Sequence, residues 1–145
     1  MSPVRALGRR NLVCLVAIAV LISGCVEAAG PTTEAADVRG SWRFTADQAA
    51  PALQLEGTLV IQSQRGDLIT GTISWEERDG SGVTRLDGGA VTGRVIDRSD
   101  VDFDVLMSGG PRRHVARLST DTMQGSWLQV ASGRSGGFRA VRGAP

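Results

Sequence analysis

The sequence predicts an all-β domain over residues 38–142, folded as an eight-stranded antiparallel up-and-down barrel. Apolar and polar residues alternate through this region, as in strands with one buried face. Clusters of Gly, Pro, Asp and Ser divide it into short segments, and no segment has the 3.6-residue period of a helix. A two-sheet β-sandwich is the alternative that the same pattern allows.

A glycine followed by large apolar residues recurs along the domain. Gly40 precedes Trp42 and Phe44, and Gly125 precedes Trp127 in a second Gly-Ser-Trp. Residues two apart in a strand share a face, so each glycine lies on the apolar face. Glycine there allows the tight bending that closure of a small barrel requires.

The alternation and the turn clusters define eight strands in order. They are residues 39–46, 53–63, 68–76, 83–96, 101–107, 112–119, 122–130 and 136–142. The connections are short, which makes neighbouring strands antiparallel, and a closed barrel leaves no exposed sheet edge. Alternation directs the following large apolar side chains inward: Trp42, Phe44, Leu59, Ile61, Ile73, Trp75, Val95, Phe103, Val105, Met107, Leu118, Met123, Trp127 and Phe138. Almost none of them carries a hydrogen-bonding group, so a cavity among them favours an apolar guest.

The first 24 residues have the layout of a secretory signal peptide. Arg5, Arg9 and Arg10 precede the apolar run 12–22, which is too short to span a bilayer comfortably. Residues 21–25, Leu-Ile-Ser-Gly-Cys, resemble a bacterial lipobox, and that resemblance implies cleavage before Cys25 and its acylation.

Cysteine usage agrees with export and lipidation. The chain has two cysteines: Cys14 lies in the apolar run and would be removed, and Cys25 would carry lipid. Two or more acyl chains anchor a protein stably in a membrane. Residues 25–37 are then the lipidated cysteine and a flexible tether, small and polar in composition. The residue after the cysteine is Val26 and not the Asp that resembles an inner-membrane retention signal. Anchoring in an outer membrane is therefore allowed if the cell has one.

Gly40-Ser41-Trp42 resembles the G-x-W signature of lipocalins and their relatives, including the avidins. The resemblance implies an Arg from the last strand packed over this Trp at the closed end of the barrel, and Arg142 has the required place and parity. Antiparallel pairing then sets Trp42 opposite Arg142 and Ala46 opposite Phe138. The chain has no Tyr, and its single Asn lies in the signal peptide, so biotin binding is not carried over.

The candidate catalytic and metal-binding residues each have a simpler interpretation. His114, the single histidine, follows two Arg near a hairpin, and we interpret it as a surface residue. Asp100, Asp102 and Asp104 resemble the start of a calcium loop, but the alternation makes them the acidic outer face of a strand. Glu76, Glu77 and Asp79 cluster at a loop and are interpreted as surface charge, although paired carboxylates also serve glycosidases.

These observations predict a non-catalytic envelope lipoprotein without cofactor or metal. Excluding the signal peptide, 13 basic residues stand against 15 acidic ones without clustering, which is not the pattern of a nucleic-acid-binding protein. The barrel either binds a small hydrophobic molecule or is packed solid and contacts other envelope components. In the first case the candidate ligand-lining residues are Trp42, Phe44, Ile73, Trp75, Phe103, Val105, Trp127 and Phe138.

Overall fold

The structure is a computed structural model that describes residues 34–82 and 84–143. The predicted signal peptide, Cys25 and most of the predicted tether lie outside the described residues. Among the residues described, no helix is long and apolar enough to cross a membrane.

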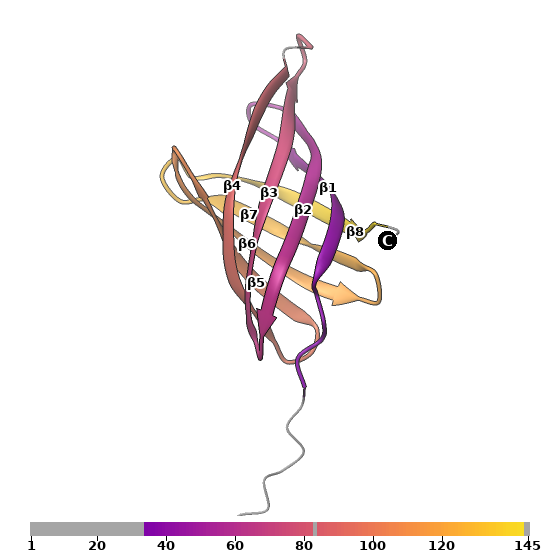
Figure 1. Ribbon diagram of the computed structural model, residues 1–145. Coiled ribbons are helices and arrows are strands. Elements are labelled where there is room, and N and C mark those ends of the chain that lie inside the picture. The colour runs from indigo at the N-terminus through magenta and orange to yellow at the C-terminus, as the bar shows by residue number, and fades with distance from the viewer. Residues whose placement is uncertain (1–33, 83, 144–145) are drawn as a thin grey trace, which may run out of the picture. The chain divides into compact units, whose positions relative to one another are not determined.

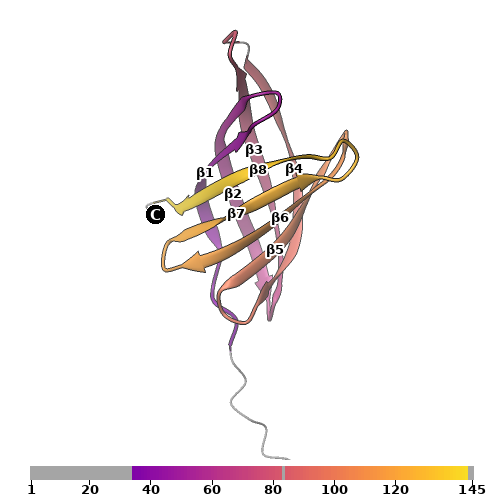
Figure 2. The ribbon, with the colours of Figure 1, turned by 180° about the vertical axis from the view of Figure 1, so that it is seen from behind.

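Eight antiparallel strands close into one barrel in sequence order, as Figures 1 and 2 show from opposite sides. The strands are β1 (Gly40–Gln48), β2 (Leu53–Arg65), β3 (Leu68–Asp79), β4 (Thr84–Ile96), β5 (Asp100–Met107), β6 (Gly110–Ser119), β7 (Thr122–Gln129) and β8 (Arg134–Arg142). The predicted barrel is confirmed, and β1 pairs with β8 to close it. The long strands β2, β3 and β4 cross β6, β7 and β8 obliquely, so the two walls enclose one core (Figures 1 and 2).

The closing register is the one expected from the sequence. Trp42 lies opposite Arg142, Phe44 opposite Ala140 and Ala46 opposite Phe138. Because side chains alternate along a strand, a slip of one residue would turn every apolar side chain of β8 outward. The burial pattern of β1 alternates strictly from Trp42 to Gln48, which shows that this register keeps the apolar face inside.

Glycines let the strands approach where the barrel wall bends most. A Cβ on Gly57 would overlap the carbonyl oxygen of Ser74, and one on Gly125 would overlap that of Val115. Both obstacles are backbone atoms of the neighbouring strand, which cannot rotate away. Glycine at these positions therefore permits the tight coiling of the sheet, as the sequence pattern predicts.

The core fills the interior and is continuous from one end to the other. Its buried apolar residues are Val38, Trp42, Phe44, Ala46, Leu55, Leu59, Ile61, Ile69, Ile73, Trp75, Val91, Val95, Val101, Phe103, Val105, Ala116, Met123, Trp127, Phe138 and Ala140. Four polar residues are buried with them: Gln48, Arg112, His114 and Gln129. The two ends of the barrel are named after the buried residues nearest to them, the Trp42 end and the Arg112 end.

Candidate functional site

The eight candidate ligand-lining residues all point into the barrel. Each is buried, and they come from β1, β3, β5, β7 and β8. Phe44, Phe103 and Phe138 lie together in the middle, and Trp75 and Trp127 lie at the Arg112 end, where Trp75 contacts Phe44 with ring centres 6.1 Å apart. Trp42 stands apart at the opposite end.

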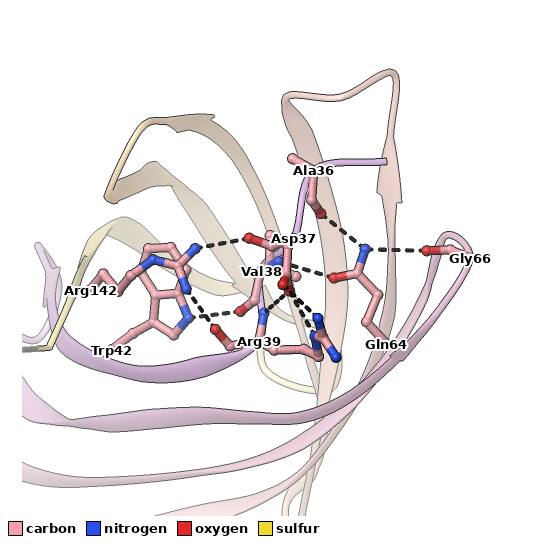
Figure 3. A network of polar contacts seen from close by, with 8 residues as sticks. All are labelled: Ala36, Asp37, Val38, Arg39, Trp42, Gln64, Gly66 and Arg142. Atoms are coloured by element: carbon pink, nitrogen blue, oxygen red, sulfur yellow. Dashed lines mark hydrogen bonds and ion pairs between the residues drawn. The ribbon is translucent and has the colours of Figure 1, made fainter. Parts of the chain in front are cut away.

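The Trp42 end is closed by a cation over an aromatic ring. The Arg142 guanidinium carbon lies 4.3 Å from the centre of the Trp42 ring. Its two terminal nitrogens donate to the backbone carbonyls of Arg39, at 2.6 Å, and Asp37, at 2.9 Å, as Figure 3 shows. The Trp42 indole N–H donates to the carbonyl of Val38 at 2.9 Å. These bonds fasten the segment before β1 across the end of the barrel.

A side chain from β2 fastens the same segment from the other side. The Gln64 amide accepts the backbone N–H of Val38 at 3.0 Å and donates to the carbonyl of Ala36 at 2.9 Å (Figure 3). Val38 is fully buried, and Ala35 and Ala36 pack against the core. In the described part of the chain, residues 35–38 therefore cover this end of the barrel.

The middle of the barrel holds His114, and the interpretation of this residue as a surface histidine is wrong. Its side chain is 0% exposed. It stacks on Phe103 with ring centres 4.6 Å apart, and its ring meets those of Phe44 and Phe138 edge to face. His114 has the same parity as Ala116 and Leu118 on β6, and that alternation directs it inward.

The environment of His114 keeps the imidazole neutral. Burial is the main cause that lowers its pKa from 6.5 to about 3, and the nearby Arg112 charge acts in the same direction. The Nδ1 atom lies 3.1 Å from the Arg112 carbonyl oxygen, which can only accept, so Nδ1 carries the proton. The Nε2 atom is then a buried acceptor, and it has no hydrogen-bond partner among the residues that the structure describes.

The Arg112 end holds a buried cation that contacts two indoles. The Arg112 guanidinium carbon lies 4.8 Å from the centre of the Trp75 ring and 4.4 Å from that of Trp127. The residue is 6% exposed, and burial lowers the pKa of its guanidinium. An arginine remains charged at neutral pH even so. The guanidinium therefore lies against two aromatic rings.

The edge of Arg112 is only partly paired. Its Nε donates to the amide oxygen of Gln129 at 3.2 Å, and a terminal nitrogen lies 3.8 Å from a carboxylate oxygen of Glu77. Glu77 also accepts the Trp75 indole N–H at 3.2 Å. The interior thus carries more hydrogen-bonding groups than the sequence predicts, because only apolar side chains were expected to point inward.

The three aspartates of β5 form the outer face of a strand, as expected. Asp102 pairs with Arg113 at 2.6 Å and Asp100 with Arg117 at 3.2 Å, while Asp104 is exposed. Within residues 34–82 and 84–143, no group of three His, Asp or Glu side chains is placed to hold a metal ion.

The three acidic residues of β3 do not form one cluster. The strand continues to Asp79, so alternation sends Glu76 outward, where it pairs with Arg78 at 3.3 Å. Glu77 turns inward toward Arg112, and its side chain is 14% exposed. The interpretation of Glu77 as surface charge is therefore wrong.

Two hollows bear on binding. One, of about 390 Å³, opens at the Arg112 end between the β1–β2 connection and the end of β3, beside Gln48, Leu53 and Gly80. The other is a groove of about 780 Å³ on the outer face of β8, β1, β2 and β3, next to Arg43 and Glu56. Arg112 lines neither hollow, while Phe44 and Trp75 line the groove.

Two solved structures are similar to this chain in fold. A structure of EF1p2_mFAP2b bound to DFHBI is similar, with a TM-score of 0.57 and 13% identity over 72% of this chain and 93% of that chain. A de novo designed fluorescence-activating β-barrel has a TM-score of 0.53 and 19% identity over the same shares of the two chains. No protein-family model and no curated protein sequence matches this chain. At these identities the likeness shows the eight-stranded antiparallel barrel fold alone.

Proposed function

We propose that this protein is an exported lipoprotein, anchored through Cys25, whose barrel binds a small molecule with a largely apolar body. The guest enters at the Arg112 end and packs against Trp75 and Trp127. Packing of an apolar core does not account for the polar side chains of Arg112, Glu77 and Gln129 beside this route.

The observation that carries the proposal is the buried Nε2 atom of His114. It is an acceptor that lies among aromatic rings and has no partner within residues 34–82 and 84–143. Leaving such a group unpaired costs about 1–3 kcal/mol, which a purely structural core avoids. A guest with one hydroxyl or N–H group would restore the missing hydrogen bond. Since the rings fill the interior, binding moves some of them aside.

The position of the anchor suits entry at the Arg112 end. The lipobox-like sequence ends at Cys25, and the chain reaches the barrel at the Trp42 end, where Ala36 and Val38 are held by Gln64. The Arg112 end is the opposite one, so the tether does not join the barrel there. A lipid on Cys25 would hold the domain at a membrane facing the cell envelope or the outside.

A binding role also fits the chemistry of the single histidine better than catalysis does. Its pKa of about 3 removes it from acid–base work at neutral pH. Its Nδ1 is bonded to a backbone carbonyl, whereas a catalytic histidine is usually oriented by a carboxylate. We therefore propose a protein without enzymatic activity.

A structural or protein-interaction lipoprotein is the second candidate. The tight ring contacts of the interior favour it, because Phe44 and Phe138 stack with centres 5.6 Å apart and leave little free volume between them. In this case the outer groove beside Arg43 and Glu56 is the surface that meets a partner in the envelope.

Titration of intrinsic fluorescence with octanol separates the two candidates. Full-length protein in dodecyl maltoside micelles should show a saturable change in tryptophan emission, measured against micelles alone. Trp75→Phe should remove most of the change, and Trp42→Phe, at the other end, should keep it. A response that never saturates, or one equal in all variants, would leave the interaction lipoprotein as the function.

A further inference from the structure

The two terminal nitrogens of the Arg112 guanidinium are hydrogen-bond donors that a ligand could pair with. The guanidinium carbon lies 4.8 Å from the centre of the Trp75 ring and 4.4 Å from that of Trp127, and Nε donates to Gln129. Gln129 is fixed in turn, because its amide nitrogen donates to the carbonyls of Gly109 and Gly110 at 3.0 Å. In the described part of the chain, the two terminal nitrogens of Arg112 form no hydrogen bond to another residue.

The acidic residues around Arg112 do not complete its pairing. Glu77 is 3.8 Å away, beyond hydrogen-bond distance, and it already accepts from Trp75. Asp87 lies near enough to interact electrostatically but pairs with Arg85 at 3.7 Å. Arg134 adds a like charge nearby. Arg112 is 6% exposed and its ion pair with Glu77 is long, so a carboxylate that accepts two hydrogen bonds would improve the pairing of this cation.

We infer that the barrel takes a small carboxylic acid, whose carboxylate binds in the plane of the Arg112 guanidinium between the Trp75 and Trp127 rings. This inference rests on the proposed function and adds a second polar group to its ligand: the carboxylate pairs with Arg112, while a hydroxyl or N–H group on the same molecule would donate to His114 Nε2. A carboxylate presents two oxygens at the spacing of the terminal nitrogens of arginine, so it can accept two parallel hydrogen bonds. The apolar body of the acid then packs against the indoles.

Glu77 has a defined part in this arrangement as the resident competitor of the ligand. Its carboxylate partly neutralises Arg112 when the site is empty and repels a second carboxylate when the ligand arrives. The Trp75 indole N–H holds Glu77 in place by the 3.2 Å hydrogen bond. A glutamine at this position would keep that acceptor and lose the charge.

Matched ligands test the inference on the full-length protein in dodecyl maltoside. Octanoate and octanol share their apolar body and differ in the carboxylate. Calorimetric titration at pH 7 should give octanoate at least about tenfold tighter binding than octanol, since charge-assisted hydrogen bonds exceed neutral ones. Arg112→Gln should abolish this preference, so that octanoate binds no more tightly than octanol. Arg113→Gln, which removes the same charge from the outer face of β6, should leave the preference intact.

A second variant gives an effect that loss of folding cannot imitate. Glu77→Gln should tighten octanoate binding several-fold and leave octanol binding unchanged, because repulsion is removed and the acceptor for Trp75 remains. If octanol binds but octanoate shows no preference, or if Glu77→Gln weakens octanoate, the inference is wrong while the proposed function stands. If neither compound binds, the proposed function itself fails.

Discussion

Arg142 and Trp42 form the latch of this barrel, with the guanidinium carbon 4.3 Å from the centre of the indole ring. The two residues are the first buried residue of β1 and the last residue of β8, and they lie directly opposite each other across the closing pair of strands. The same guanidinium donates to the carbonyls of Asp37 and Arg39. One side chain therefore joins strand closure to the cover of the Trp42 end.

Loss of either member of this latch should destabilise the fold. Trp42→Ala should lower the free energy of unfolding by about 3–5 kcal/mol, because a fully buried indole leaves a large cavity. Arg142→Ala should cost roughly 2 kcal/mol through the cation–π contact and two charge-assisted hydrogen bonds. Urea denaturation followed by circular dichroism measures both.

Arg139→Ala is the matched control for the latch, because Arg139 is exposed on the outer face of the same strand. Its effect should stay within about 0.5 kcal/mol, as for an ordinary surface site. Equal losses for Arg142→Ala and Arg139→Ala would show that the latch contributes nothing specific.

The close strand approach at Gly57 should make this glycine hard to replace. In Gly57→Ala the new methyl group would overlap the carbonyl of Ser74 on β3, so the barrel wall would have to shift. The expected loss of stability is about 3 kcal/mol or more, at the upper end of overpacking effects. Gly80→Ala, in the β3–β4 loop, meets no atom within 4 Å and should be tolerated. Thermal unfolding of both variants tests the claim, which fails if their midpoints agree.

Burial of His114 predicts how stability depends on pH. The unfolded chain takes up a proton near pH 6.5, and the folded barrel takes it up only near its pKa of about 3. The contribution of neutral His114 to the free energy of unfolding is fully present above pH 6.5 and is lost as the pH falls toward 3. Between pH 6.5 and 4.5 the free energy of unfolding should fall by roughly 2–3 kcal/mol from this residue.

His114→Phe isolates the contribution of the histidine, because it removes the titrating group and retains a ring to stack on Phe103. The variant should lose less stability over this pH range than the parent does. Since His114 is the single histidine, its ring resonances should also stay constant from pH 7 to 4.5. An NMR titration with a midpoint near 6.5 would contradict the buried, neutral state.

The predicted lipid anchor has its own test. Cys25→Ser should abolish lipidation and leave the protein unprocessed or released from membranes, since the lipobox-like segment ends at this residue. Mass spectrometry of the mature N-terminus measures the outcome. Cleavage at another position with an unmodified Cys25 would exclude the anchor.

The strands and their pairing could be predicted from the sequence because both depend on local patterns. Alternation and turn residues define the strands, and short turns define which strands pair. The register of β1 with β8 followed from the places of Trp42 and Arg142 and agrees with the structure. His114 was expected at the surface because it lies near a turn. The alternation along β6 instead directs Arg112 and His114 inward.

The Arg112 layer could not be predicted in the same way. The stacking of Arg112 between Trp75 and Trp127 joins β6 to β3 and β7. β3 and β6 are not hydrogen-bonded neighbours, so their contact depends on how far the strands are staggered around the barrel. Alternation gives the direction of each side chain, but the stagger decides which side chains reach the same level.

Native mass spectrometry of the full-length protein, released from its own membranes in mild detergent, tests the binding proposal most directly. If the barrel binds a small molecule, the spectrum should show one such molecule on each chain. Collisional activation should remove it, and excess octanol should displace it. Protein that carries no adduct in any preparation, and gains none when incubated with octanol or octanoate, would contradict small-molecule binding by this barrel.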